Sequence, residues 1–219
     1  MSERNQKNIL EIKQEIANSI THGLGAALSI AALTILVVFA SLQGNPWKIV
    51  SFSLFGASLI LLYVFSTLYH SFTNPKVKRF LRILDHCSIF ILIAGTYTPI
   101  TLVTLRVPIG WTLFGLTWGM AICGIIFKSF FTGKYNKISI LFYIFMGWII
   151  IFALKPLIQN SSTHLLIWFL IGGACYTLSK FIGLLYLLFL YYFLFLIFYG
   201  IFYPDRYQIA LSGFAICNK

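Results

Sequence analysis

The residues best suited to chemistry in this chain are a few polar side chains in or beside strongly apolar stretches: His22, His70, Asp85 and His86. Ser66 lies four residues before His70, so in a helix the hydroxyl and the imidazole share one face. Ionisable groups in apolar segments are costly without a partner, and they therefore indicate a functional site. Imidazole and carboxylate together suit Zn²⁺, which activates a bound water near neutral pH.

Each of these residues also has a purely structural interpretation. A histidine at a helix end often hydrogen-bonds a carbonyl or meets lipid headgroups, and Asp85 at the start of an apolar run is typical of a helix N-cap. Four such groups at one depth favour a shared site instead. His164 follows a later apolar run and Asp205 lies near the end of the chain, so we expect both to lie apart from the others.

The composition places these groups in a membrane protein. The 219 residues are 59% hydrophobic and 10% charged, whereas a soluble domain has about 45–50% apolar and about 25% charged residues. A water-soluble fold of this length could not cover so much apolar surface. Four cysteines without a CxxC pair exclude a disulfide scaffold. We therefore expect a multi-pass protein of the cell membrane.

Five apolar runs are long enough for a membrane-spanning helix, which needs about 20 residues. They cover residues 21–42, 49–69, 83–105, 109–127 and 138–157. A further stretch, 165–203, contains Lys180 as its only charge and fits one or two more spans. The pattern predicts an all-α transmembrane bundle of six to seven helices in residues 21–203. A segment of residues 1–20 precedes it, and a tail of residues 204–219, foreign to the family named below, follows it.

Basic residues predict the orientation of the bundle, because they accumulate in cytoplasmic loops. With the N-terminus in the cytoplasm, the inner segments before residue 165 contain Arg4, Lys7, Lys13, Lys76, Lys78, Arg79, Arg82, Lys128, Lys134 and Lys137. The outer segments contain only Lys48, Arg106 and Lys155. We therefore predict a cytoplasmic N-terminus, with the four ionisable candidates near the cytoplasmic face. The same rule accounts for the net charge of +11, so we expect no nucleic-acid partner.

Several motifs in register along the chain point to a known family. They are Glu15-Ile-Ala-Asn18-Ser-Ile-Thr21-His22-Gly23, Ser66-Thr-Leu-Tyr69-His70, Leu84-Asp85-His86, Ala94-Gly95-Thr96-Tyr97-Thr98-Pro99, Gly110-Trp111, Tyr143 with Gly147-Trp148, and Gly172-Gly173-Ala-Cys-Tyr176-Thr177-Leu178. From about residue 15 to residue 178 the chain strongly resembles the bacterial hemolysin III family, relatives of the progestin and adipoQ receptors.

The resemblance implies a seven-helix membrane protein with a zinc ion near the cytoplasmic face. His70 matches the family's ligand on the second helix, Ser66 its hydroxyl, and Asp85 the aspartate that holds the zinc-bound water. The other two ligands of the family come from an HxxxH motif on the seventh helix, and this chain has no histidine after His164. We therefore expect zinc to bind weakly or not at all, with His22 and His86 as the auxiliary candidates.

The composition changes abruptly where the resemblance ends. Residues 181–203 contain only Phe, Leu, Tyr, Ile and Gly. Such low complexity needs no selected function. It is typical of a shifted reading frame through A/T-rich sequence, and the alternative is a divergent paralogue that has abandoned the metal. We favour the shifted frame.

Three functional hypotheses follow. The first is a zinc-dependent membrane amidase or lipid hydrolase, with Asp85 orienting the water and Ser66 assisting the oxyanion; as written, the chain is expected to be inactive. The second is a receptor-like or regulatory protein without turnover. The third is a cytolysin, as the family name suggests, although the spans lack the repeated polar stripe that lines a channel. Membrane lipids are the expected partners, with a lipid substrate in the first case, and the oligomeric state stays open.

Overall fold

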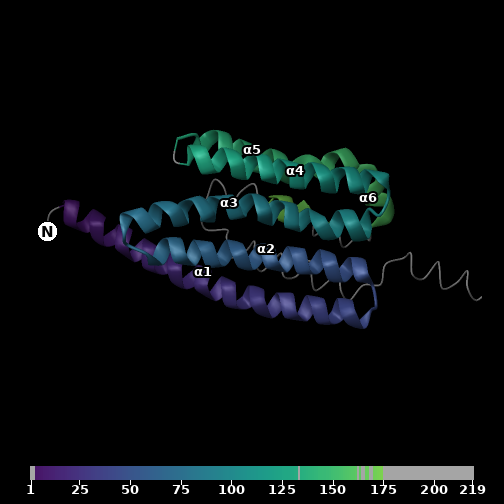
Figure 1. Ribbon diagram of the computed structural model, residues 1–219, viewed down its shortest axis with the longest axis horizontal. Coiled ribbons are helices and arrows are strands. Elements are labelled where there is room, and N and C mark those ends of the chain that lie inside the picture. The colour runs from purple at the N-terminus through teal and green to yellow at the C-terminus, as the bar shows by residue number, and fades with distance from the viewer. Residues whose placement is uncertain (1–2, 133, 162, 164–165, 168–169, 175–219) are drawn as a thin grey trace, which may run out of the picture.

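The computed structural model describes residues 3–132, 134–161, 163, 166–167 and 170–174, and it is built from long helices. These helices are α1 (Glu3–Leu42), α2 (Pro46–Ser71), α3 (Pro75–Pro99), α4 (Pro108–Phe131), α5 (Asn136–Trp148) and α6 (Leu154–Asn160). A π-helical turn, η1 (Ile100–Thr104), extends α3, and a 3₁₀ segment, η2 (Ile149–Ala153), joins α5 to α6. Helix α3 lies between the α1–α2 pair and the α4–α5 pair (Figure 1).

The described residues confirm the all-α class and the five predicted spans before residue 165. Five helical segments are long and apolar enough to cross a membrane: Asn5–Leu42, Pro46–Ser71, Pro75–Thr104, Pro108–Phe131 and Lys137–Asn160. Each corresponds to one predicted apolar run. The further spans predicted within residues 165–203 lie mostly outside the described residues, and so do the tail and His164.

Proline and asparagine mark the starts of three helices. Helices α2, α3 and α4 each start at a proline, whose fixed φ suits the first helical turn. The side chain of Asn45 accepts hydrogen bonds from the backbone N–H groups of Trp47 and Lys48, and Asn74 caps α3 in the same way. Because α3 begins at Pro75, the interpretation of Asp85 as an N-cap is wrong.

Helix α1 is much longer than one crossing requires. Its 40 residues extend for about 60 Å, twice the roughly 30 Å of a hydrocarbon core. Residues 3–20 therefore continue the first span as a helix beyond the membrane. His22 lies in the middle of this helix, so it is not tied to a helix start as the apolar pattern suggests.

Two apolar cores meet at α3. One lies among α1, α2 and α3 and includes Leu36, Phe55 and Tyr63, while the other joins α3 to α4, α5 and η2 around Phe90 and Met146. The close approach of α1 to α2 depends on a glycine, because a Cβ at Gly25 would lie 2.7 Å from the ring of Tyr63. This approach brings α1 against the part of α2 that leads to His70.

A side chain of α3 hydrogen-bonds two backbone groups at the helix break between α5 and η2. The Tyr97 hydroxyl donates to the carbonyl of Gly147 at 2.7 Å and accepts from the N–H of Ile150 at 3.1 Å. Buried backbone groups inside a membrane need internal partners. Tyr97 is such a partner at the point where the regular α-helical hydrogen bonding of α5 ends.

Candidate functional site

All five candidate residues lie on the first three helices. His22 is on α1, Ser66 and His70 are on α2, and Asp85 and His86 are on α3. Ser66 is buried, and His70 follows one turn later in the last turn of α2. The end of the bundle where α1, α3 and α5 begin and α2 and α4 end is called the amino-terminal end here (Figure 1). His70 lies at this end.

His70 belongs to an ion cluster that joins all three helices. Glu15 of α1 places one carboxylate oxygen 2.7 Å from His70 Nδ1 and the other 2.9 Å from Lys78 Nζ of α3. A carboxylate only accepts hydrogen bonds, so the imidazole donates through Nδ1–H. Glu15, His70 and Lys78, called the ion cluster below, thus fix the ring orientation of His70.

Aromatic rings surround the ion cluster. The ring of His22 lies 5.7 Å from that of His70, measured between centroids, and 5.8 Å from that of Tyr63. The ring centroid of Tyr69 lies 4.7 Å from that of His70, and the ammonium of Lys78 lies 5.3 Å from the Tyr69 centroid. Two of the candidate histidines, His22 of α1 and His70 of α2, are therefore neighbours in the structure.

Asp85 and His86 form a second polar group on α3. His86 Nδ1 donates to the carbonyl of Arg82 at 2.8 Å, one turn earlier on the same helix, and lies 3.4 Å from Asp85 Oδ2. The structure thus places Asp85 beside His86 on α3. The convergence of Asp85 with Ser66 and His70 stays a prediction.

A family model described as Haemolysin-III related matches residues 10–211 of the chain. The chain belongs to this family. The multi-pass helical architecture agrees with that membership. The matched range extends beyond residue 178, so it includes the low-complexity segment, whose proposed origin in a shifted frame stays a prediction.

Two bacterial relatives align with most of this hemolysin III chain. Hemolysin-3 of Bacillus cereus is 51% identical over 179 residues, which are 82% of each protein. The Hemolysin-3 homolog of Bacillus subtilis (strain 168) is 47% identical over 168 residues, covering 77% of this chain and 79% of the relative. The human monocyte to macrophage differentiation factor is 26% identical over 141 residues, which cover 61% of this chain and 57% of that relative. No solved structure matches the chain.

Among the residues that the structure describes, the ligands for a zinc ion do not form a complete set. In the part of the chain that the structure describes, no group of three His, Cys, Asp or Glu side chains could hold a metal. His70, the ligand that the resemblance implies, donates from Nδ1 to Glu15, and His86 donates from Nδ1 to its own helix. Both rings keep Nε2 as the nitrogen that could bind a metal. Within the described residues, however, the auxiliary ligands suggested by the sequence do not complete a set of three.

Sequence reasoning missed Glu15 and Lys78 as members of the site. Both lie in segments that the charge pattern assigns to the cytoplasm, and Glu15 is 55 residues away from His70. A signal was nevertheless present, because Glu15 and His22 are seven residues apart and so share one face of a continuous helix. Extending that helix backwards from the first apolar run would have found the contact.

Proposed function

We propose that this hemolysin III protein keeps the residues of a zinc-dependent lipid hydrolase, Ser66, His70 and Asp85, but does not retain zinc and does not hydrolyse lipids as written. The observation that carries the proposal is the number of ligands. The described helices supply no set of three His, Cys, Asp or Glu side chains that could hold a metal. The hydrogen bond from His70 Nδ1 to Glu15 leaves Nε2 as the nitrogen that would bind a metal.

The ligand requirement supports this proposal. A catalytic zinc site needs about three protein ligands and a water. Helix α2 supplies one imidazole and α3 supplies one carboxylate, while the sequence contains no histidine after His164. Losing an outer-shell partner alone costs about 10–100-fold in metal affinity, so the loss of two direct ligands costs more.

A regulatory or receptor-like role without turnover is the second candidate. The ion cluster favours it, because one carboxylate links α1 to α2 and α3. A ligand that displaces any one of these helices would disturb the contacts of the other two. Such a protein would bind a ligand at this end of the bundle and release no product.

A cytolytic role is supported by the names of the two Bacillus relatives. The five described spans speak against a pore formed by the chain itself, since they carry no repeated polar stripe. Leakage of dye from liposomes at low protein density would support the cytolytic role. Liposomes that stay sealed would exclude it.

The decisive experiment is elemental analysis of the purified full chain, combined with an assay for fatty acid or amine release from lipid amides and esters. We expect much less than one zinc per protein and no released product, and His70→Ala should leave the metal content unchanged. His164→Ala serves as the control, because this histidine is predicted to lie apart from the site. One zinc per protein that disappears only in His70→Ala would refute the proposal.

A further inference from the structure

The amino-terminal end of the bundle carries basic side chains that are open to the surroundings. Two short connections lie at this end, one between α2 and α3 and one between α4 and α5 (Figure 1). Lys76 and Arg79 beside the first, and Lys134 and Lys137 beside the second, are all exposed. None of these four forms an ion pair with another side chain in the described residues.

Two of the acidic groups at this end are engaged by other side chains. Glu15 is shared between His70 and Lys78, and Asp85 lies beside His86. Glu11 forms no ion pair within the described residues, so no carboxylate contacts the four exposed bases there. Their positive charge is open to an external anion.

The basic residues at the opposite end are used differently. Lys48 is buried, and its Nζ donates to Gln43 Oε1 at 3.0 Å. The guanidinium of Arg106 lies 4.8 Å from the ring centroid of Trp47. Two of the three bases at that end are thus held by the protein's own side chains, which sets the amino-terminal end apart.

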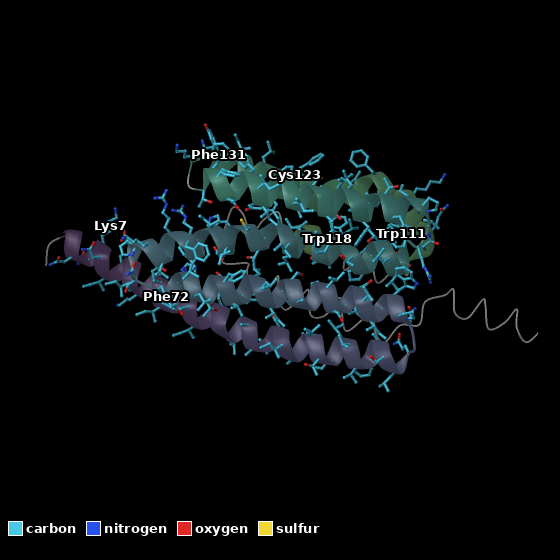
Figure 2. The ribbon with its side chains drawn as sticks, in the orientation of Figure 1. Lys7, Phe72, Trp111, Trp118, Cys123 and Phe131 are labelled. Carbon is cyan, nitrogen blue, oxygen red and sulfur yellow. The ribbon has the colours of Figure 1, made fainter. Side chains whose placement is uncertain are left out.

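Large apolar side chains are interleaved with the four exposed bases. Phe72 and Phe80 are exposed beside the first connection, and Phe131 and Tyr135 beside the second. Phe72 and Phe131 lie towards the same end of the molecule as Lys7, whereas Trp111 lies towards the other (Figure 2). Aromatic side chains prefer the level of the lipid headgroups, where one part of the ring is apolar and the other is wet.

We propose that the amino-terminal end binds the headgroups of anionic phospholipids. Lys76 and Arg79 contact phosphates on one side of the bundle and Lys134 and Lys137 on the other, while the aromatic rings reach the boundary of the acyl chains. Anionic lipids concentrate in the cytoplasmic leaflet, and basic clusters next to a span are attracted to them. This surface is independent of the proposed loss of zinc.

The test compares two lipids on the intact protein. The full chain is placed in nanodiscs of phosphatidylcholine containing phosphatidylglycerol, and the lipids retained after mild extraction are quantified by mass spectrometry. Each neutralised base should weaken the preference for phosphatidylglycerol by about fivefold. We therefore measure the paired variants Lys76→Gln with Arg79→Gln, and Lys134→Gln with Lys137→Gln.

A matched pair at the opposite end serves as the control. Arg106→Gln with Lys155→Gln removes the same charge and should leave the preference unchanged. The melting temperature of each variant in pure phosphatidylcholine shows whether it folds. In the wild-type protein, added salt should weaken the preference without any mutation.

The proposal is overturned if the wild-type preference for phosphatidylglycerol does not depend on salt, or if this preference survives both paired variants. An equal loss of the preference in the control pair would also overturn it. Competition by inorganic phosphate, which lacks acyl chains, should not abolish the preference. If it does, the surface recognises free phosphate and not a lipid.

Discussion

Replacing Glu15 by Gln tests the ion cluster most directly, because the side chain keeps its shape and loses its charge. The hydrogen bond to His70 is short, at 2.7 Å, and the imidazole is only 17% exposed. A hydrogen bond to a charged group is worth about 1.5–3 kcal/mol. The pair with Lys78 is more exposed, at 28% for Lys78 and 37% for Glu15, and such pairs contribute about 0.2–1 kcal/mol.

Because Gln retains an acceptor oxygen, we expect Glu15→Gln to lower the free energy of unfolding by about 2 kcal/mol. For a chain of this size this corresponds to a fall in melting temperature of about 4–8 °C. The measurement is thermal unfolding of the purified chain in detergent. Glu11→Gln is the control, because it removes the same charge one turn earlier on α1, where Glu11 forms no ion pair within the described residues.

A double-mutant cycle with Lys78→Met isolates the charge coupling between Glu15 and Lys78. We expect a coupling energy of about 0.5 kcal/mol for this partly exposed pair. Addition of a chelator to the wild-type protein should leave the melting temperature unchanged. The stabilising role of Glu15 is refuted if Glu15→Gln has the same melting temperature as the wild-type protein. It is also refuted if the chelator lowers the melting temperature as much as the substitution does.

Three further predictions concern packing, the helix break and orientation. Gly25→Ala should destabilise the chain by about 1–3 kcal/mol, because its Cβ would meet the buried ring of Tyr63. Gly119→Ala on the open face of α4 should instead stabilise it by about 0.5–1 kcal/mol. Opposite shifts of the two melting temperatures in thermal unfolding would confirm this difference. Tyr97→Phe should cost about 2 kcal/mol in the same assay, since two backbone groups lose their partner, and an unchanged melting temperature would contradict the assigned contacts. In a cysteine-free background, Lys76→Cys should react with an impermeant thiol reagent only after the cells are opened, and labelling of intact cells would reverse the predicted orientation.

The spans could be predicted because the membrane imposes one strong rule on the sequence. A helix needs about 20 apolar residues to cross, and the breaks between the runs are marked by Pro46, Pro75 and Pro108, at each of which a helix begins. The family could be predicted because its motifs are dense and in register. Length, apolarity and local motifs are all properties of contiguous sequence.

The missing part of the site depends on contacts between distant residues. Glu15 lies in a segment whose isoleucines, at residues 9, 12, 16 and 20, recur at helical spacing. That pattern predicts that α1 continues through Glu15, but it does not show which residue of another helix Glu15 contacts. Its partner on α2 is determined by how α1 packs on α2, which depends on Gly25. The break after α5 was missed for a similar reason, because residues 138–157 read as one apolar run and the group that completes the break, Tyr97, lies on another helix.

The contacts of Tyr97 have a consequence for the biogenesis of the protein. The α5–η2 segment leaves backbone groups unpaired along its own length, and in lipid such groups cost several kcal/mol. Their partner is on α3, which is synthesised earlier and is already available when α5 leaves the ribosome. We therefore expect the fifth span to complete its insertion by docking on the third, and a chain that lacks Tyr97 to insert this span less completely.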